Sequence, residues 1–360
     1  MLEDRDPADP VPDAATTVVV GARPRRRSAL RRVLVGMGVL TTVLALAVAG
    51  GAWYLTDRYA GNIASAGDVF DGLDEASRPA VASPVTATTA DPVTFLLVGS
   101  DTRADISAGE VPDSRSDAIM VARLSGDRKH VQIISIPRDS WVDIPGYGMD
   151  KINAAYAYGG PSLLVQTVEN LTGVRIDHYA AISFNELISM TDALGGVDVT
   201  VPETTSWGPY TFPAGVNHLD GEGARWYVGQ RHGLPGGDFD RVKRQQNYLR
   251  AMFGKLFAAG TFTSLDQIDS VLTTVTSSIA VDDSLGTADL LGLVLSARDL
   301  TPDDIAFFTA PVLGTGTEGS ASVVYLDQAT GARMWGYLQT DSLGQNAAEF
   351  ADEALGAVVN

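Results

Sequence analysis

Charged side chains stand at the ends of three apolar runs that have the length of β-strands. Asp101 and Arg103 come directly after the first run, Asp117 comes just before the second, and Arg138 follows the third. Ligand sites in open α/β sheets gather where strands end. If the first two strands are antiparallel neighbours, Asp101 and Asp117 approach each other and offer the hard carboxylate ligands that Mg²⁺ uses beside phosphate oxygens. Taken singly, each aspartate is also an ordinary residue for a loop cap or a turn.

A second group of charged residues lies in a basic segment that runs from Arg225 to Arg250. It contains five arginines in a chain whose net charge is −18. Guanidinium groups bind phosphate through paired hydrogen bonds, and Arg241 and Gln245, four residues apart, share one helix face. These features indicate phosphate binding. The alternative is a solvated helix that Asp238 or Asp240 caps.

Composition excludes several classes of protein. There are no cysteines, which rules out disulfide scaffolds and thiolate metal sites. Residues 1–32 hold seven arginines and five acidic residues, so the rest of the chain carries a net charge of −20. Such an acidic body argues against nucleic-acid binding, which depends on lysine and arginine. The GxGxxG match at 314–319 lies between two late strands and is better interpreted as a turn.

An uncharged apolar run covers residues 33–56. As a helix it reaches roughly 36 Å, enough to cross a hydrocarbon core of about 30 Å. Six arginines lie just before the run, and Trp53, Tyr54 and Tyr59 lie at its far end, where interfacial aromatic residues are common. We therefore predict a single-pass membrane protein with a cytoplasmic N-terminus and an extracytoplasmic body. A cleaved signal peptide is the alternative, although this run is longer than a typical h-region.

The rest of the chain divides by composition. Residues 1–32 are predicted to form a disordered cytoplasmic tail, and 57–91, rich in Pro, Ala, Ser and Thr, an extracytoplasmic linker. The folded domain is expected to cover 92–343, and 344–360 to form a C-terminal tail or a weak helix.

Apolar runs and helical periodicities alternate within the expected domain. Strands are predicted at 93–99, 118–124, 130–136, 179–184, 197–202, 305–313 and 322–327, and helices at 162–173, 185–196 and 241–259. This alternation predicts an α/β fold, a single three-layer α-β-α domain with a mixed central sheet, preceded by one N-terminal transmembrane helix.

Six segments, taken in order, resemble the LytR-CpsA-Psr family of cell-envelope proteins. They are FLLVGSDTR (95–103), RSDAIMV (115–121), ISIPRDSWVDIPG (134–146), KINAAYAYGGP (151–161), ALGGVDVTVP (193–202) and LDGEGARWYVGQRHGLPGGDFDRVKRQQ (219–246). The resemblance implies a mixed sheet flanked by helices, with an apolar pocket for a polyprenyl chain. It also implies a phosphotransferase at the cytoplasmic membrane that moves a glycopolymer from a polyprenyl-pyrophosphate carrier onto peptidoglycan.

The same resemblance implies roles for individual residues. Asp101 and Asp117 match metal-binding positions, for Mg²⁺ or Mn²⁺, and Arg103 and Arg138 match basic positions near the pyrophosphate. Attack by a sugar hydroxyl needs a base or an ordered acceptor, and Asp101 or Asp238 is the candidate base. Asp101, Asp238 and Arg138 are therefore expected to act in catalysis. The family's phosphate-contacting cluster matches Arg231, Arg241, Gln245 and the acidic Asp238.

One position departs from the family pattern. Gly229 stands where the family usually has the first arginine of an Arg-x-Arg motif. Loss of one charge-assisted phosphate contact costs about 1.5–3 kcal/mol, which slows an enzyme by roughly one to two orders of magnitude. Arg225, four residues earlier, is the candidate to replace it. Two alternatives to the transferase therefore stay open: a protein that binds lipid-linked glycopolymer without transferring it, and a hydrolase that uses water as acceptor.

Overall fold

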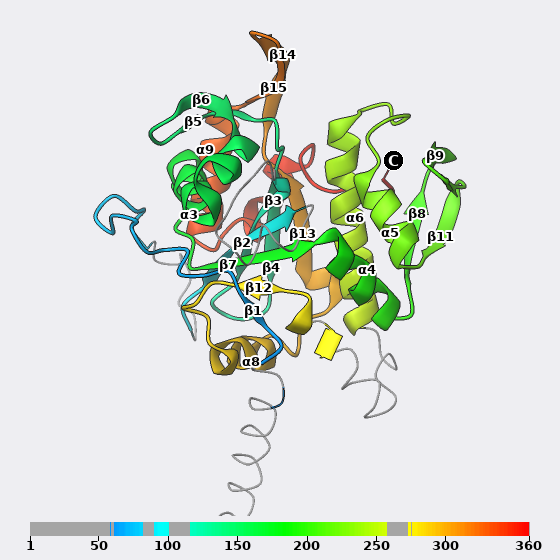
Figure 1. The fold of residues 1–360 in the computed structure, drawn as a ribbon, viewed down its shortest axis with the longest axis horizontal. Helices are drawn as coiled ribbons and strands as arrows, with labels where there is room; N and C mark the ends of the chain where they lie inside the picture. The colour runs from blue at the N-terminus through cyan, green and yellow to red at the C-terminus, as the bar shows by residue number, and fades with distance from the viewer. Residues whose placement is uncertain are drawn as a thin grey trace, which may run out of the picture. The chain divides into compact units, whose positions relative to one another are not determined.

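The computed structural model describes residues 58, 61–81, 90–100, 116–257, 273, 274 and 276–359. A seven-stranded sheet lies at the centre of the domain, in the order β1-β12-β7-β2-β3-β4-β13 (Figure 1). Its strands are β1 (Ala64–Ser65), β2 (Val93–Ser100), β3 (Ser116–Leu124), β4 (Val131–Ile136), β7 (His178–Ser183), β12 (Ala280–Val281) and β13 (Ile305–Thr309). The β2–β3, β3–β4 and β7–β12 pairs are antiparallel, and the β2–β7, β4–β13 and β1–β12 pairs are parallel. The predicted mixed sheet is thus confirmed.

Strand β3 explains why this sheet is buried on both faces. Ile119 and Val121 belong to one apolar cluster, and Met120 and Ala122 belong to another. Successive side chains of a strand point to opposite faces. A continuous apolar run is therefore what a central strand with two covered faces requires.

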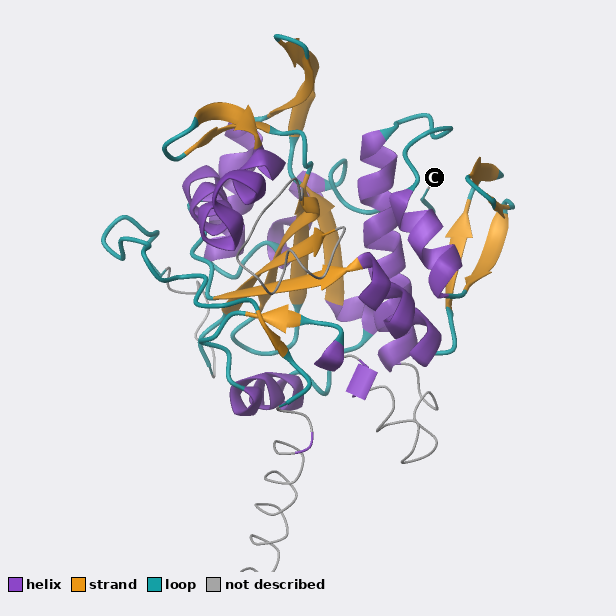
Figure 2. Ribbon diagram, viewed as in Figure 1, coloured by secondary structure: helices purple, strands orange, loops and turns teal. Residues whose placement is uncertain are grey.

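Helices lie on both sides of the sheet (Figure 2). The cluster that contains Ile119 also contains side chains of α3 and α9, and the cluster that contains Met120 packs against α6. Helices α4 and α5 join α6 in a third apolar cluster. The helices are α3 (Ile152–Thr172), α4 (Phe184–Ala193), α5 (Gly221–Gly229), α6 (Asp238–Phe257), α8 (Thr287–Ser296) and α9 (Gln328–Gln339), with 3-10 turns η1 (Pro302–Asp304) and η2 (Gly344–Phe350).

Helix α3 is longer than the helix predicted at 162–173, and it is kinked. Gly159 and Gly160 have non-helical backbone angles, and Gly160 has a φ of 64°. Pro161 follows directly and lacks the N–H that a continuous helix would use. The kink therefore separates a short first stretch, which ends at Tyr158, from the main part of the helix.

Two predicted strands exist but do not join the central sheet. The strand expected at 197–202 pairs with β11, and the strand expected at 322–327 pairs with β14 in a hairpin. Hydrophobic alternation predicts a strand but does not name its partner, because partners are set by tertiary packing. The small two-stranded sheets are β5 (Trp141–Ile144) with β6 (Gly148–Lys151), β8 (Val197–Val201) with β11 (Gly215–Leu219), β9 (Thr205–Trp207) with β10 (Tyr210–Phe212), and β14 (Val312–Glu318) with β15 (Ala321–Leu326).

The folded domain begins earlier than predicted. Part of the expected linker, residues 61–81, contributes the edge strand β1 and the buried side chain of Val69. Arg78 Nη2 lies 2.8 Å from Glu169 Oε1 and also donates to the carbonyl of Ile176. These contacts tie the segment to α3 and its end, a role that its Pro- and Ala-rich composition did not indicate.

The expected C-terminal tail is also part of the domain. Phe350 is fully buried, and Leu355 donates a backbone hydrogen bond to Phe307 of β13. Thr309 donates in turn to the carbonyl of Glu353, which anchors the segment along the edge strand.

Among the residues that the structure describes, no helix is both long and apolar enough to cross a membrane. The transmembrane helix predicted at 33–56 and the tail predicted at 1–32 lie outside these residues.

Candidate active site

Four charged side chains, from strand β3, the turn after β4 and helix α6, meet at one end of the sheet. Arg138 Nη1 donates a hydrogen bond to Asp117 Oδ1, and Arg241 Nη1 lies 3.6 Å from the same oxygen. Arg241 Nη2 lies 2.8 Å from Asp238 Oδ1, and Arg138 Nε lies 3.9 Å from that atom. Two carboxylates and two guanidinium groups thus alternate in a ring, which we call the Asp/Arg cluster.

The sheet register brings the first half of this cluster together. Ile119 of β3 pairs with Ile136 of β4 in antiparallel register. Asp117 lies two residues before Ile119 on β3, and Arg138 lies two residues after Ile136, just beyond the end of β4. The antiparallel register therefore brings Asp117 and Arg138 together. The first turn of α6 supplies the second half, because Asp238 and Arg241 are three residues apart and share a helix face.

Burial makes the electrostatics of the cluster strong. Arg241 is only 4% exposed. Burial lowers its pKa from the ordinary value, and the nearby Arg138 and Arg231 lower it further, whereas Asp238 and Asp117 raise it. Within the described part of the chain, Nε of Arg138 and Nε of Arg241 have no hydrogen-bond partner. Unpartnered buried donors are costly, and an anionic ligand with several acceptor oxygens would satisfy them.

Arg231 lies beside the cluster on an exposed segment that follows α5. The preceding residue, Gln230, is fully buried and holds this segment in place. Its amide nitrogen donates to the carbonyls of Ser206 and His232, and its Oε1 accepts a hydrogen bond of 2.6 Å from Arg244 Nη1.

Arg244 has a structural role that sequence reasoning missed. Its side chain is fully buried, its Nη2 donates to Thr205 Oγ1 at 2.7 Å, and its guanidinium lies 4.6 Å from the centre of the Tyr227 ring. Within the basic segment nothing distinguished it from the phosphate-binding arginines.

Arg244→Ala is therefore expected to destabilise the folded domain by about 2–4 kcal/mol, because it leaves Gln230 Oε1 buried without its charged donor. Urea unfolding of the chain, followed by circular dichroism, measures this. Arg225→Ala is the matched control, since its exposed pair with Glu222 at 3.8 Å contributes at most about 1 kcal/mol. Equal midpoints for the two variants would contradict the scaffold role.

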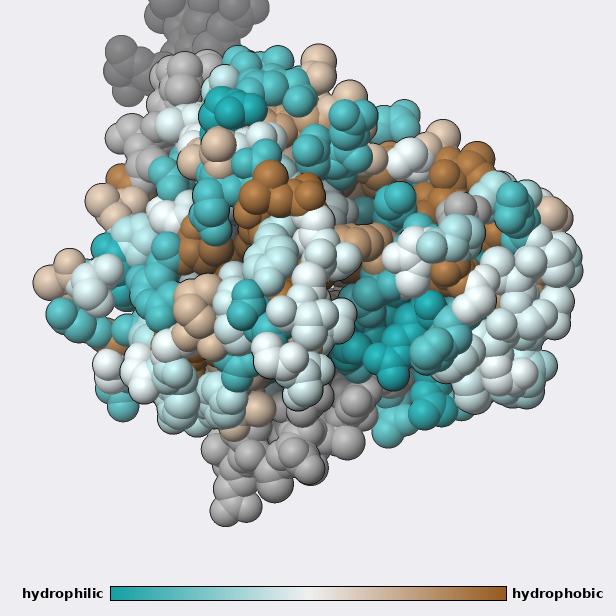
Figure 3. Space-filling model, turned by 90° about the horizontal axis from the view of Figure 1, so that it is seen from above, coloured by the Kyte–Doolittle hydropathy of each residue, from teal (hydrophilic) through white to brown (hydrophobic). Residues whose placement is uncertain are grey.

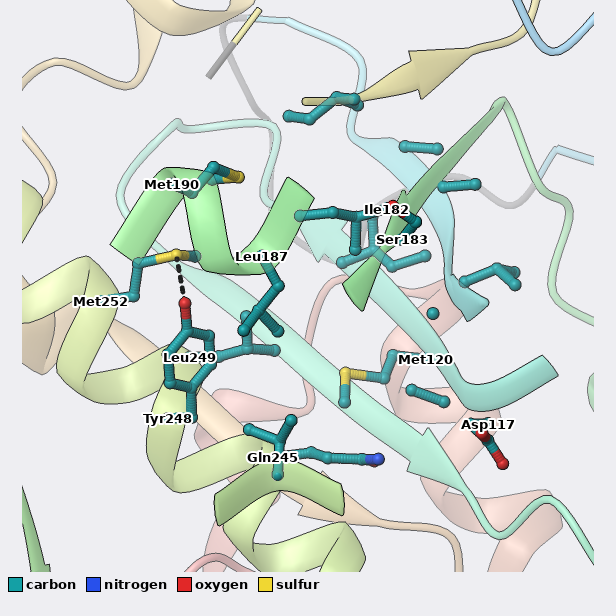
Figure 4. A pocket seen from close by; sticks show the side chains of 18 of the residues that line it. Asp117, Met120, Ile182, Ser183, Leu187, Met190, Gln245, Tyr248, Leu249 and Met252 are labelled. Carbon is teal, nitrogen blue, oxygen red and sulfur yellow. Dashed lines mark hydrogen bonds between the residues drawn. The ribbon is translucent and has the colours of Figure 1, made fainter. Parts of the chain in front are cut away.

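An apolar cavity of about 300 Å³ opens beside the Asp/Arg cluster. It lies between strands β2, β3 and β7 and helices α4 and α6, and Asp117 and Gln245 are polar residues in its lining (Figure 4). Its other walls include Met120, Leu187, Met190, Leu249, Met252, Phe253 and Leu256. Leu249, Met252, Phe253 and Leu256 of α6 thus line a cavity.

The hydroxyl of Tyr248 is a further polar group in the wall of the cavity, and it is neutral. Tyr248 contacts the hydroxyl of Thr191 at 2.8 Å and lies 3.8 Å from Met252 Sδ. Burial raises the pKa of Tyr248 to about 12. The cavity therefore presents an uncharged wall until it reaches Asp117.

The structure brings together most of the predicted site residues that it describes. Asp117, Arg138, Asp238 and Arg241 form the cluster, Arg231 lies close by, and Gln245 lies at the polar end of the cavity. Asp101 and Arg103 lie outside the described residues.

The structure also shows the surroundings of Gly229, the position that departs from the family pattern. A Cβ added to Gly229, the last residue of α5, would meet nothing within 4 Å. Arg225, the candidate replacement, is half exposed and pairs with Glu222. In this structure Arg225 thus has a surface partner of its own.

The predicted metal site is only partly described. Within the described ranges, no three His, Asp or Glu side chains form a group that could hold a metal ion. Of the predicted pair, Asp117 is the residue that the structure describes. It lines the cavity, and its carboxylate contacts Arg138 and Arg241. One or two carboxylates completed by water and phosphate oxygens are a typical Mg²⁺ environment, and Asp117 supplies one such carboxylate.

Comparison with known proteins decides the family. The sequence model of the LytR_cpsA_psr family matches residues 67–340. The chain belongs to this family. The matched range begins in the segment 61–81 and ends after α9, so it contains every described residue of the Asp/Arg cluster and the cavity.

Curated family members give the sequence relationship. The cell wall biosynthesis protein LcpA of Corynebacterium glutamicum is 33% identical over 279 residues, which cover 65% of this chain and 53% of LcpA. The polyisoprenyl-teichoic acid–peptidoglycan teichoic acid transferase TagU of Enterococcus faecalis is 36% identical over 201 residues, which cover 56% of this chain and 64% of TagU. The chain thus spans between about half and two thirds of these relatives.

Solved structures of LytR_cpsA_psr proteins share the fold. TagV of B. subtilis superposes with a TM-score of 0.58 at 26% identity, covering 69% of this chain and 97% of TagV. TagT bound to LI-WTA superposes with a TM-score of 0.56 at 26% identity, covering 74% of this chain and 96% of TagT.

Proposed function

We propose that this chain transfers a glycopolymer from a polyprenyl-pyrophosphate carrier onto peptidoglycan outside the cytoplasmic membrane. One observation carries the proposal: the apolar cavity reaches Asp117, the residue that pairs with Arg138 and Arg241. A prenyl chain fits an apolar slot, and a pyrophosphate fits the arginines at its end. The names of TagU, a teichoic acid transferase, and of TagT bound to LI-WTA support the same substrate class.

The reaction exchanges one phosphorus–oxygen bond for another. The oxygen of an acceptor sugar hydroxyl attacks the phosphorus that carries the glycopolymer. The phosphoanhydride bond breaks, and polyprenyl phosphate leaves with the bonding electron pair. The hydroxyl proton passes to a carboxylate, for which Asp101 and Asp238 are the candidates.

The arginines would stabilise the charge that this exchange moves. Arg138 and Arg241 are pre-positioned by Asp117 and Asp238, so little reorganisation is needed when negative charge shifts toward the leaving oxygen. Arg231 and Arg103 would bind the remaining phosphate oxygens, and Gln245 would contact the phosphate next to the lipid. Mg²⁺ or Mn²⁺, held by Asp101 and Asp117, would supply further charge neutralisation.

The predicted transmembrane helix at 33–56 would keep this domain at the membrane surface. A lipid-linked substrate is confined to the same surface, so anchoring raises its effective concentration at the site. The acidic body makes nucleic acid an unsuitable partner.

Gly229 favours a second candidate, a slow hydrolase or a protein that only binds the carrier. A missing arginine next to Arg231 weakens phosphate contacts, and Arg225 pairs elsewhere. The open space around Gly229 makes this candidate testable, because a Cβ added there meets no atom within 4 Å.

Gly229→Arg is expected to raise the rate of pyrophosphate cleavage about 10- to 100-fold, the reverse of losing one charge-assisted contact. The full chain would be incubated with geranylgeranyl pyrophosphate, and prenyl phosphate release followed with Mg²⁺ and with a chelator. Gly292→Arg, at an exposed position of α8 with equally open surroundings, is the control.

Three results of this assay separate the candidates. Slow Mg²⁺-dependent release by the wild type, accelerated by Gly229→Arg alone, supports the transferase site. Release only after Gly229→Arg means that this chain has lost turnover and binds the carrier. No release by either protein, with the lipid still bound, makes the binding protein the better account.

A further inference from the structure

Two exposed tyrosines form a stacked pair at the tip of the β5–β6 hairpin. Tyr147 is 57% exposed and Tyr158 is 44% exposed, and their rings lie 4.6 Å apart at an angle of 13°. We call these two side chains the tyrosine platform. Exposed apolar side chains that gather in one place usually mark an interaction site.

The platform is held rigidly by its backbone. Ile144, Pro145, Gly146 and Tyr147 form a β-turn in which Tyr147 N–H donates to the Ile144 carbonyl at 2.9 Å. Proline in the second position and a glycine with a φ of 82° in the third are typical of a type II turn. Tyr147 is therefore fixed where the strand β6 begins.

Tyr158 is fixed from the other side. Its hydroxyl donates to Asp150 Oδ2 at 2.6 Å, and the kink of α3 follows it directly. Rigid tyrosines offer a large contact area at a low entropic cost.

The platform is connected to the Asp/Arg cluster by one short hairpin. Lys151 Nζ, at the end of β6, lies 3.0 Å from Asp139 Oδ1, and Asp139 follows Arg138 in the chain. Trp141 pairs with Lys151 and Ile144 pairs with Gly148, so the hairpin extends four residues from this end. Four residues of strand span roughly 13 Å, which places the platform within reach of a bound oligomer.

The platform and the apolar cavity lie on opposite faces of the central sheet. The hairpin packs with α3, on one face of the sheet, and the cavity lies on the face that α6 covers (Figure 1). In phosphoryl transfer the attacking and leaving oxygens are roughly in line. If the prenyl phosphate leaves toward the cavity, the attacking hydroxyl approaches from the side of the hairpin.

We propose that the tyrosine platform binds sugar rings of the acceptor glycan strand, next to the hydroxyl that attacks. This inference rests on the proposed function and names the acceptor's binding site. Sugar rings have C–H faces that pack on the faces of aromatic rings, whose quadrupole attracts positively polarised edges. Sugar hydroxyls at the rim of such a contact can donate to the carboxylate of Asp150, which contacts Tyr158.

Charge favours a neutral glycan over a lipid surface at this place. Asp150 is partly exposed beside Tyr158, Asp143 is exposed on the other strand of the same hairpin, and Lys151 is engaged by Asp139. Anionic headgroups attract basic segments and would be repelled by these carboxylates. Figure 3 shows hydrophilic residues and apolar patches side by side on the face of the domain that is seen from above.

Binding and footprinting of the full chain test the proposal. A soluble β-linked N-acetylhexosamine oligomer would be titrated into the protein, and hydroxyl-radical labelling of Tyr147 and Tyr158 read by mass spectrometry. We expect the oligomer to protect these side chains and Tyr147→Ala to weaken its binding about tenfold. Tyr147→Phe keeps the ring and should bind like the wild type. Val216→Ala, which removes a 73% exposed side chain on β11, should change nothing.

The outcomes separate this inference from the proposed function. Tyrosine-dependent glycan binding supports the platform even if no prenyl phosphate is ever released, in which case the proposed reaction alone fails. Equal binding by Tyr147→Ala and the wild type overturns the platform, as does the absence of glycan binding. Protection by lipid vesicles without glycan, with none by the oligomer, would assign the tyrosines to a membrane surface and overturn it as well.

Discussion

Arg241→Ala is expected to lower kcat/KM for polymer transfer by about 10²–10³-fold, the range measured when one pre-positioned donor is removed from a reacting centre. The guanidinium is 4% exposed and lies 3.6 Å from Asp117 and 2.8 Å from Asp238. Its loss removes a proposed phosphate ligand and leaves Arg138 alone to neutralise the two carboxylates of the cluster. Initial rates with a lipid-linked polymer in nanodiscs measure the effect.

Arg241→Lys should recover little of this loss. A lysine keeps the charge but cannot direct separate N–H groups to Asp117, Asp238 and a phosphate at once. Arg225→Ala, on the exposed face of α5, should stay within about twofold of the wild type because surface pairs contribute little. Arg241→Ala that folds normally and retains a third of the activity would contradict the assigned role.

Asp117→Asn is expected to reduce kcat about 100-fold or more while leaving the affinity for lipid pyrophosphate unchanged or higher. Asp117 Oδ1 accepts from Arg138 and lies near Arg241, so it competes with the substrate for both guanidinium groups. A neutral amide frees them to bind the ground state but removes the proposed metal ligand. Loss of an interaction made only in the transition state appears in kcat rather than in binding.

Equilibrium binding and single-turnover rates separate the two effects of this substitution. Asp198→Asn, whose carboxylate is 64% exposed and pairs with His218, is the matched control and should leave both quantities unchanged. If Asp117→Asn weakened binding tenfold with kcat intact, Asp117 would serve to hold the substrate rather than to promote turnover.

The central strands of the fold were predictable because burial on both faces leaves a strong signal. Runs such as 93–99 and 118–124 are apolar except for Thr94 and Arg123, and they form β2 and β3 with shifts of only a residue or two. Sheet membership was harder to predict. The strand at 197–202 alternates in polarity like any half-buried strand, and only the packing of α5 and α6 sets it against β11.

The segments that flank the domain were not predictable from composition. Strand β1 has two residues, too few for a periodic pattern, and it is held by parallel pairing to β12 some 215 positions later in the chain. The C-terminal segment has a weak helical pattern, yet Phe350 is fully buried. In both cases long-range contacts provide the order.

The residues of the candidate site also differ in how far the sequence predicts their roles. Asp117, Arg138, Asp238 and Arg241 were predicted from residue type and from motif order, and the sheet register and the first turn of α6 explain why they meet. Arg244 shows the limit of this reasoning. It has the residue type of a phosphate ligand, but Tyr227, Thr205 and Gln230 enclose it. Which arginine of a basic helix faces the ligand depends on the elements that pack around it.

We propose that the Asp/Arg cluster and the cavity form one site that transfers a lipid-linked polymer to peptidoglycan. The most direct measurement follows a labelled glycopolymer on a polyprenyl-pyrophosphate carrier, with the full chain in nanodiscs and peptidoglycan as acceptor. We predict that label appears on peptidoglycan with one polyprenyl phosphate released per polymer attached, and that Arg241→Ala removes both signals. Polyprenyl phosphate release without label on peptidoglycan, or label transfer that persists in Arg241→Ala, would contradict the account.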